Sequence, residues 1–424
     1  MEKPISHPAD VADQLQRLPP EEAREVLRQL PRKEGAAVLA ELNAEAWPTL
    51  VAELSASELA ELVHELPDPQ AVDLLLTLSV EHRGDVLRGL AAEETKHISA
   101  LMQYRPDSAG GIMSNRFLTL RTDQTVEECQ RLLRGKAEAM GPETISYLYV
   151  TDSASKLAGI VSMRDLVFQR PDRDIAEIMN RDVKHVSVED DQERIAQLFE
   201  HYHYMALPVL EQDGRLVGIV AANQVIDIVQ KEATEDMQLM VGLSGEERAL
   251  TPWQKSIRRR LPWLCINLAT AFLAGAVVGA FETTIAAWTA LAIFLPIVAG
   301  QGGNAGAQTL TVIIRDMALG ELSIGDGKKA LLKELTLGLV NGAAIGLIVG
   351  LVSFLWKGSV VLGVVVGMAM VLNMIAAAFS GVLVPYTLRA FKIDPALASS
   401  ILVTTVTDVA GFFFFLGLAA LAMR

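Results

Sequence analysis

The amino-acid sequence predicts a multidomain protein that joins an all-α superhelical N-terminal domain, an internally duplicated α/β domain, a connecting helix and a five-helix transmembrane domain. Charge divides sharply along the 424-residue chain: the first 260 residues carry 29 basic and 44 acidic side chains, whereas the remainder carries 8 and 7. Five apolar stretches in the second part are long enough to cross a bilayer, which takes roughly 20 residues each. The acidic first part argues against a nucleic-acid partner, since phosphate binding needs concentrated Lys and Arg, and favours multivalent cations.

Residues 1–107 form the predicted helical N-terminal domain. Leucine-proline pairs at 18–19, 30–31 and 66–67 are each followed by a polar-apolar helical pattern such as EEAREVLRQL. Proline just after one helix and at the start of the next is the expected punctuation of short helices. The pattern predicts a superhelical repeat module. A protein-interaction scaffold and a ligand-binding domain both fit it.

Residues 108–227 contain an internal duplication. The segment GGIMSNRFLTLRTDQTVEECQRLL is echoed by AEIMNRDVKHVSVEDDQERIAQLF, and ISYLYVTDSASKLAGIVSMRDLV is echoed by YMALPVLEQDGRLVGIVAANQVI. Each copy predicts an opening strand, a helix, two β-rich runs around a polar turn and a second helix. The repeated GIV after a turn resembles a tandem CBS pair.

CBS pairs often bind adenine nucleotides through a Ser or Thr and an Asp just after this glycine. The resemblance implies that Ser162 and Asp165 of the first copy are candidate nucleotide ligands, with ATP as the candidate cofactor. The second copy carries Ala221 and Gln224 at those places. At most one nucleotide half-site is therefore expected.

Residues 228–256 are predicted to connect the soluble and membrane parts, with a helical pattern over 228–250. Glu232, Glu235 and Asp236 fall at i, i+3 and i+4 and therefore share one helix face. Like charges at this spacing repel one another unless a cation or a basic partner lies between them. A cation site and a merely solvated face both remain open.

The five predicted membrane spans cover residues 261–281, 286–314, 331–355, 361–388 and 396–422. With the soluble part inside, the inner ends carry most of the flanking positive charge: Arg258, Arg259, Arg260, Arg315, Lys328, Lys329, Lys333, Arg389 and Lys392. The outer ends carry only Lys357 and Arg424. This bias obeys the positive-inside rule. It predicts a multi-pass protein of the cell inner membrane, surrounded by lipid, with a cytoplasmic N-terminus and an external C-terminus.

The second span holds the densest set of polar and small residues, LPIVAGQGGNAGAQTLTVIIR. Gln301, Asn304 and Gln308 lie at i, i+3 and i+7, so their amides form one stripe. The neighbouring glycines let another backbone or an ion approach closely. Tight helix packing would explain the glycines alone. Glycines combined with a co-facial amide stripe favour a permeation path.

The fifth span contains a carboxylate at membrane depth. The Asp394-Pro395 pair predicts a helix start, as an N-cap followed by a first-turn proline. Asp408 then lies near mid-membrane, with Thr404 on the same face. A charge there costs a few kcal/mol, and the spans offer no Lys or Arg at membrane depth to pair with it, since Lys333 lies at an inner end. Its counterion is therefore expected to be a passing cation.

Phe412 and Phe415 extend the Asp408 stripe toward the outer end of the fifth span. The sequence leaves open whether they line a pore or pack on a neighbouring helix. The donors in the spans are oxygens, with no thiolate cluster or imidazole, which favours a hard ion. Magnesium suits one carboxylate with amides, because it dehydrates reluctantly and keeps several waters.

Helical repeats, tandem CBS domains, a connecting helix and five spans with PIVAGQGGNAGAQ and TDVAG resemble the MgtE-type magnesium transport family over nearly the whole chain. The resemblance implies a homodimer in which Asp408 forms the ion-selectivity site of a magnesium channel on the dimer axis. It also implies that cytosolic Mg²⁺ closes the pore by bridging the soluble domains and a plug helix. The matching regulatory acids are Asp73, Asp227, Glu232, Glu235, Asp236 and Asp394.

Two departures from the family pattern concern the regulatory acids. The chain has Asn223 and Gln224 where the family usually carries a pair of acids, and Pro69 interrupts the acidic pattern of the helical module. Weaker or different magnesium gating is therefore expected.

Two other classes of function remain open. In a proton-coupled secondary transporter of divalent metal ions, Asp408 would carry a proton. In a membrane-anchored CBS sensor nothing would be conducted, which the amide stripe and Asp408 argue against. An enzyme is not expected, because the sequence has no nucleophile–base pair, phosphate-binding glycine loop or catalytic metal spacing.

Overall fold

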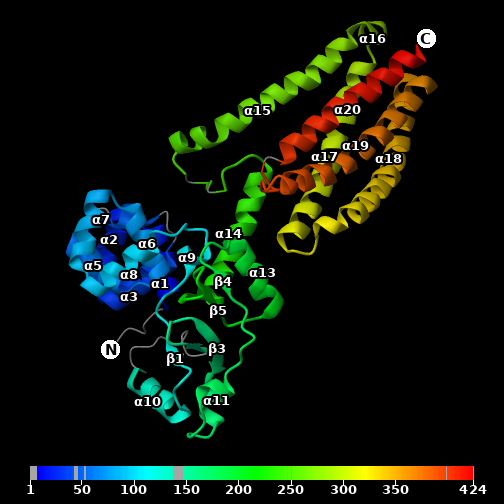
Figure 1. Ribbon diagram of the computed structural model, residues 1–424. Helices are drawn as coiled ribbons and strands as arrows, with labels where there is room; N and C mark the ends of the chain where they lie inside the picture. Colours follow the sequence, from blue (N-terminus) through cyan, green and yellow to red (C-terminus); the bar gives the residue numbers. More distant parts are fainter. Residues whose placement is uncertain are drawn as a thin grey trace. The chain divides into compact units, whose positions relative to one another are not determined.

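The computed structural model describes residues 7–42, 46–51, 54–136, 147–245, 247–249, 251–397 and 399–423 (Figure 1). The chain divides into two compact units, Met1–Val229 and Gln230–Arg424. The first contains the helical module and the duplicated α/β domain. The second contains the long apolar helices.

The helical module is built from short helices separated by single turns. They are α1 (Pro8–Arg17), α2 (Pro20–Gln29), α3 (Arg32–Glu41), α4 (Trp47–Val51), α5 (Ala56–Glu65), α6 (Asp68–Thr77), α7 (Val80–Gly89) and α8 (Ala92–Leu101). Leu18, Leu30 and Leu66 each end a helix in extended backbone, and the proline that follows each of them caps the next helix. The leucine-proline punctuation therefore marks real helix boundaries.

The α/β domain has two copies of one small sheet within the described residues. Strands β1 (Thr119–Arg121), β2 (Tyr147–Thr151) and β3 (Leu157–Ser162) form the first; β4 (Val186–Ser187), β5 (Ala206–Leu210) and β6 (Leu216–Ala221) form the second. In each copy the first pair of strands is parallel and the second antiparallel, with a register shift before the last residue of the middle strand. This equivalence confirms the α/β architecture predicted from the duplication.

The helices of the α/β domain are α9 (Ala109–Ile112), α10 (Val126–Lys136), α11 (Met163–Phe168), α12 (Ile175–Ile178) and α13 (Gln192–Tyr202). The connecting helix α14 (Ala222–Met240) starts directly after β6 and ends ten residues before the predicted helical pattern does. Gly242 and Gly245 follow it with φ of +77° each. This left-handed backbone suits glycine and stops the helix.

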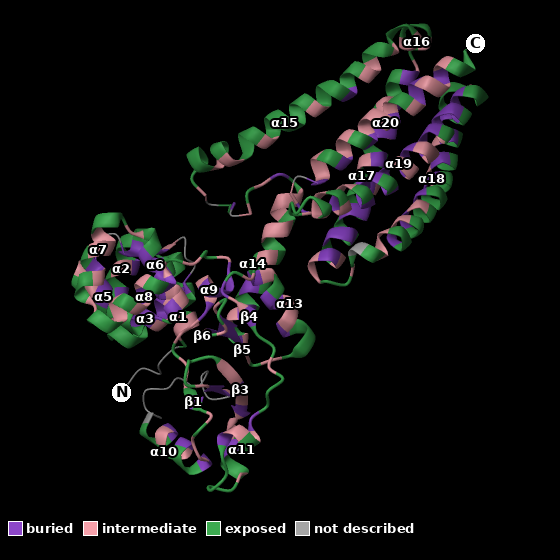
Figure 2. Ribbon diagram, viewed as in Figure 1, coloured by how far each residue is buried: buried purple, intermediate pink, exposed green. Residues whose placement is uncertain are grey.

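The membrane unit contains α15 (Trp253–Ala280), α16 (Glu282–Ala287), α17 (Leu291–Ala318), α18 (Gly327–Lys357), α19 (Val360–Ala390) and α20 (Ser399–Ala422), with a 3₁₀ turn over Ile324–Asp326. Helix α19 packs against α17, α18 and α20, whereas α15 lies along α20. Figure 2 shows the consequence: α15 is exposed along most of its length and α19 is the most buried of the long helices.

Among the described residues, α15, α18, α19 and α20 are long and apolar enough to span a bilayer. Helix α17 is not in this set, because the amides and glycines of GQGGNAGAQ lower its mean hydropathy. It is 28 residues long and packs against α19 and α20. Helix α17 corresponds to the second of the five predicted spans, residues 286–314, and its crossing of the membrane stays a prediction. Lys357 lies at the end of α18, while Arg424 lies outside the described residues.

Helices α18 and α19 approach each other closely along a glycine seam. Gly346 and Gly350 of α18 face Gly367 and Gly363 of α19, and a Cβ on any of the four would come within 3 Å of the carbonyl oxygen opposite. In lipid, helices associate through such close packing rather than through a hydrophobic driving force. The seam therefore holds the α18–α19 pair together.

Replacing Gly346 with Val is expected to destabilise the membrane unit, because its Cβ position lies 2.6 Å from the Gly367 carbonyl oxygen. Overpacking of this kind costs about 1–3 kcal/mol. Thermal unfolding in detergent should show a lower apparent Tm. Gly275→Val on α15 is the matched control, since nothing lies within 4 Å of its Cβ position. An equal loss of Tm in both variants would contradict the prediction.

Candidate functional site

A buried amide joins three helices of the membrane unit. Asn373 of α19 is fully buried, and its Nδ2 donates to the Val298 carbonyl oxygen of α17 over 2.9 Å. A Cβ at Gly302 would overlap the Asn373 amide, and one at Gly411 of α20 would lie 2.7 Å from it. Both glycines are therefore required for Asn373 to fit. This contact sets how α17 and α20 meet.

The glycines of α17 fall into two groups. Gly302 and Gly306 face neighbouring helices, because added Cβ atoms there would collide with Asn373 and Val403. Gly300 has nothing within 4 Å of its Cβ position, and Gly303 has only an ordinary contact with Thr404 at 3.9 Å. Tight helix packing thus explains the glycines at 302 and 306 but not the glycine at 300.

The predicted amide stripe lies on the open face of α17. Gln301, Asn304 and Gln308 are all exposed, while Gly302 and Gly306 on the other face are buried. Within the described part of the chain, none of the three amides forms a side-chain hydrogen bond. A polar stripe on a long apolar helix is costly in lipid unless a partner or water covers it.

Asp408 is half-buried on α20, at its tenth residue. No Lys or Arg of the described chain forms an ion pair with it. Thr404 lies one turn nearer the start of α20, against Gly303 of α17, and its hydroxyl donates to the Ser400 carbonyl over 2.6 Å. The hydroxyl oxygen keeps its acceptor capacity. Asp408, Thr404 and the amide-bearing helix therefore lie along one seam between α17 and α20.

The start of α20 differs from the prediction. The helix begins at Ser399 rather than at Pro395, and Asp394 accepts a hydrogen bond from the Ala396 amide over 2.7 Å. Asp394 thus closes a turn before the helix instead of capping it. Nine residues separate Ser399 from Asp408, roughly 13 Å of helical rise, so Asp408 stays near the middle of the helix.

The two phenylalanines left open by the sequence have different surroundings. Phe415 is fully buried in an apolar cluster with Leu291, Phe294 and Val298, so it packs on neighbouring helices rather than lining a pore. Phe412 is half-exposed.

One of the predicted regulatory acids in the second compact unit has a strongly perturbed pKa. Burial, followed in order by the charges of Asp394, Glu232 and Glu235, raises the pKa of Asp236 to about 7. Among the described residues, no group of three or more His, Cys, Asp or Glu side chains is close enough to hold a metal ion. The acids near Asp236 are therefore within electrostatic range of it without forming a compact cluster.

Asp73 and Asp227 lie in the first compact unit. Asp73 is exposed on α6 and Asp227 is exposed on α14. Asn223 and Gln224, which replace the expected acids, begin the same α14. The side-chain oxygen of Gln224 accepts from the Ala221 amide over 3.0 Å and so caps that helix.

A cavity of about 200 Å³ lies between the two α/β copies. Tyr147 and Tyr149 line it from the first copy; Asp182, Lys184 and Tyr204 line it from the second copy, the first two from the segment between α12 and β4. The Tyr149 hydroxyl is buried and has no hydrogen-bond partner within the described residues. The cavity is thus walled by aromatic rings and contains an unused donor.

Ser162 and Asp165 do not line this cavity. The Ser162 hydroxyl caps α11 by accepting from the Asp165 amide over 3.0 Å, and it donates to the Asp165 carboxylate over 2.6 Å. Ser162 pairs with Tyr147 in the β2–β3 ladder, which places it beside the cavity wall. Their nucleotide role stays a prediction.

Sequence reasoning missed a buried carboxylate on α18. Glu334 of α18 is 5% exposed; its Oε2 accepts from the Thr309 hydroxyl of α17 over 2.9 Å, and its Oε1 lies 3.1 Å from Lys333 Nζ. Thr309 directly follows Gln308 in the sequence. The bond therefore ties the amide-bearing helix to α18. An acid next to a Lys inside an apolar stretch was the available signal.

Three family models match the chain. "MgtE intracellular N domain" covers residues 6–107, "CBS domain" covers 109–171 and 175–231, and "Divalent cation transporter" covers 295–418. "Magnesium transporter MgtE" of Thermus thermophilus is 38% identical over 334 residues, 77% of this chain and 72% of that protein. The protein of the same name from Bacillus subtilis is 34% identical over 333 residues, 78% of this chain and 73% of that protein.

A solved structure described as the cytosolic domain of the Mg²⁺ channel MgtE in complex with ATP is also similar. It matches with a TM-score of 0.50 and 34% identity, over 53% of this chain and 91% of that chain.

Thr309→Val is expected to lower the stability of the membrane unit, because it leaves the buried Glu334 Oε2 without its donor. Such an unsatisfied group costs about 1–3 kcal/mol. The apparent Tm in detergent should fall, and Thr309→Ser should restore it. Thr311→Val is the control, since the exposed Thr311 hydroxyl bonds only to the Ala307 carbonyl of its own helix. If Thr309→Ser is as unstable as Thr309→Val, the hydrogen bond is not the cause.

The raised pKa of Asp236 predicts a pH dependence in metal-free protein. Between its ordinary value of 3.8 and about 7, folded Asp236 holds a proton that the unfolded chain has released. The free energy of unfolding should therefore rise as the pH falls from 7 to 4. Urea unfolding in EDTA should show this slope, and Asp236→Asn should flatten it. Asp326→Asn is the matched control and should leave the slope between pH 7 and 4 unchanged, because hydrogen bonds from Ser323 lower the pKa of Asp326 and place its titration below this range. A wild-type slope unchanged by Asp236→Asn would refute the assignment.

Proposed function

Because the chain belongs to the MgtE family of magnesium transporters, we propose that it is a magnesium-selective ion channel with Asp408 at its selectivity site. One observation carries the proposal: Asp408 is half-buried near the middle of an apolar helix, without a Lys or Arg partner in the described chain. A carboxylate kept there at a cost of a few kcal/mol is explained by a cation that passes it.

The amide stripe supports a pore shared by two subunits. Gln301, Asn304 and Gln308 are exposed in the single chain, although lipid is a poor environment for amides. A homodimer with this face on its two-fold axis would cover the stripe and present two Asp408 carboxylates to one ion. Closed symmetric dimers are the commonest oligomers of soluble proteins, and the same geometric argument applies in the membrane.

The chemistry of the stripe suits a hydrated ion. Magnesium gives up its water reluctantly, so it is expected to pass with several waters attached. Amide oxygens and the Thr404 hydroxyl oxygen accept hydrogen bonds from such waters, while Asp408 supplies the negative charge. Binding through water is weak enough for the ion to leave, which conduction requires.

We propose regulation by cytosolic Mg²⁺ through the acids Asp73, Asp227, Glu232, Glu235, Asp236 and Asp394. Mutual repulsion around Asp236, whose pKa is raised to about 7, is relieved when a divalent cation is added. Asn223 and Gln224 remove two charges from the expected set, so the pore of this chain should close at a higher Mg²⁺ concentration than that of a relative with acids at both positions.

The cellular location that fits this function is the inner membrane, with the N-terminus in the cytoplasm and the C-terminus outside.

A second ligand is suggested for the α/β domain. The cytosolic domain of a relative was crystallised with ATP, and the 200 Å³ cavity of this chain has tyrosine walls and the unused Tyr149 hydroxyl. Aromatic rings stack on an adenine base. We therefore propose an adenine nucleotide at this cavity, with Ser162 and Asp165 beside it.

Flux measurements with Asp408→Asn test the channel proposal. Neutralising Asp408 should reduce Mg²⁺ uptake into proteoliposomes roughly tenfold or more, equivalent to about 1.4 kcal/mol of lost ion stabilisation. Asp326→Asn, at the start of α18, should leave the flux unchanged. Equal flux in wild type and Asp408→Asn would overturn the proposal. A wild-type flux that requires a pH gradient would favour the proton-coupled transporter instead.

A further inference from the structure

A pocket of about 420 Å³ lies between the last turns of α17 and the first turns of α18. It is at the end of the membrane unit that carries most of the flanking positive charge. The lining includes Val312, Ile313 and Asp316 of α17, Lys329 and Lys333 of α18, and Glu321 of the connection between them. These six residues belong neither to the proposed ion path nor to the proposed regulatory acids.

The pocket and the amide stripe lie on different faces of α17. The Thr309 hydroxyl donates to Glu334 over 2.9 Å, so Thr309 faces α18. Ile313 and Asp316 follow it at i+4 and i+7 and therefore share that face. Gln308 of the stripe is one position away from Thr309, about 100° around the helix. A second subunit that covers the stripe therefore does not need to cover the pocket.

The pocket lies across the boundary between hydrocarbon and headgroups. Helix α18 has 31 residues, which gives about 46 Å of helical rise against about 30 Å of hydrocarbon. Lys329 precedes the predicted span 331–355, and Lys333 lies in the first turn of that span. On α17, Val312 is 42% exposed and lies inside the predicted span 286–314, whereas Asp316 lies beyond it. An apolar wall next to a charged rim suits a lipid molecule.

The charges of the pocket have both signs and come from different elements. Asp316 Oδ1 lies 3.1 Å from Arg315 Nη1, and Glu321 Oε2 lies 4.0 Å from the same nitrogen. Two carboxylates thus share one guanidinium at this end. The side chain of Lys329 is 88% exposed, and its Nζ lies 3.7 Å from Asp326 Oδ1. One end of the pocket therefore suits a cationic group, and the α18 side suits an anionic one.

The other two acids of the lining are already bound within the protein. Glu334 accepts from Thr309, and its Oε1 lies 3.1 Å from Lys333 Nζ. Asp326 accepts from the hydroxyl and the amide of Ser323. Two lysines alone would suggest an anionic lipid. Because four acids line the pocket against these two lysines, a headgroup with net negative charge is disfavoured and a zwitterionic one is favoured.

We propose that this pocket binds the headgroup of phosphatidylethanolamine, a zwitterionic phospholipid with a primary amine. The phosphate lies at Lys329 and Lys333, the ammonium at Asp316 and Glu321, and an acyl chain along Val312. The ammonium of ethanolamine, like that of lysine, donates three hydrogen bonds, whereas the trimethylated nitrogen of choline donates none. The site does not rest on the proposed channel function.

Native mass spectrometry of the full-length protein tests the site. The protein in detergent is titrated with dioleoyl phosphatidylethanolamine, phosphatidylcholine and phosphatidylglycerol, which differ only in the headgroup. The first ethanolamine lipid is expected to bind wild type roughly tenfold more tightly than the first choline lipid, because hydrogen bonds to charged groups are the stronger ones. The glycerol lipid, which is anionic, should also bind more weakly than the ethanolamine lipid.

Variants separate the two ends of the headgroup. Asp316→Asn combined with Glu321→Gln should lower the affinity for the ethanolamine lipid to that for the choline lipid. Lys329→Gln should weaken both lipids several-fold and keep their ratio, since both carry the phosphate. Glu321 and Lys329 are exposed, and the apparent Tm in detergent checks folding. Lys328→Gln is the matched control, because Lys328 is exposed and does not line the pocket; it should leave all three affinities unchanged.

Three results would overturn the assignment. The first is equal affinity of wild type for the ethanolamine and choline lipids. The second is tighter binding of the glycerol lipid, which would make this an anionic-lipid site. The third is an ethanolamine preference that survives in the variant without the two acids. Since the titration does not measure Mg²⁺ flux, failure of the channel proposal would leave these lipid affinities unchanged.

Discussion

Close packing around α19 is the constraint on which the membrane unit depends. Glycines let α18 and α19 meet backbone to backbone, and Gly302 and Gly411 make room for the buried Asn373 between α17 and α20. The hydrophobic effect does not drive helices together in lipid, so these close contacts and the hydrogen bond from Asn373 to Val298 stabilise their association. Small residues are therefore structural on these faces.

The open face of α17 follows from that packing. Because Gly302 packs against α19 and Gly306 against α20, the rotation of α17 about its own axis is fixed. Gln301 and Asn304 therefore lie on its open face. The Thr309–Glu334 hydrogen bond fixes the same rotation from the side of α18. This fixed polar stripe, beside a carboxylate without a basic partner in the described chain, is the surface at which we propose that an ion passes between two subunits.

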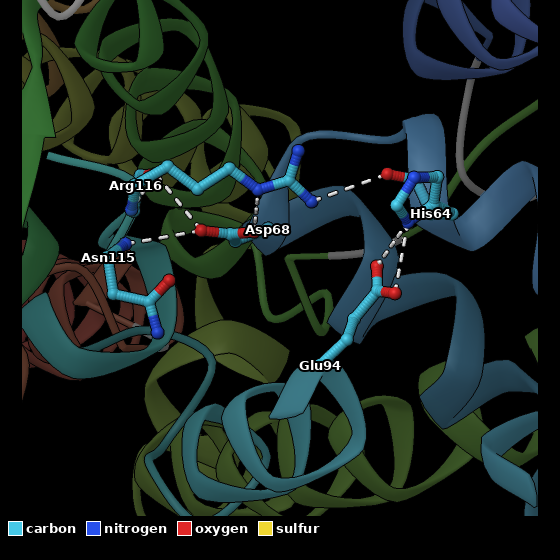
Figure 3. Close-up of polar contacts among 6 residues, drawn as sticks. His64, Asp68, Glu94, Asn115 and Arg116 are labelled. Carbon is cyan, nitrogen blue, oxygen red and sulfur yellow. Dashed lines mark hydrogen bonds and ion pairs between the residues drawn. The ribbon is translucent and has the colours of Figure 1, made fainter. Parts of the chain in front are cut away.

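Outside the long apolar helices, interactions between charged groups become more important. Buried Asp68 is matched by an ion pair with Arg116 and by hydrogen bonds from Ser114 and Asn115 (Figure 3). Asp236 lies among like charges, and burial together with their repulsion raises its pKa.

The sequence alone determined the architecture, because helical punctuation, internal duplication and apolar length are local properties. It also made Asp408 the candidate ion site, since a lone carboxylate in an apolar run is visible without coordinates. The tertiary structure decided the partners: Asp68 with Arg116, Asn373 with Val298, and Glu334 with Thr309. These pairs join residues 25 to 75 positions apart, and which side chains meet depends on helix rotation and packing, which no local pattern encodes.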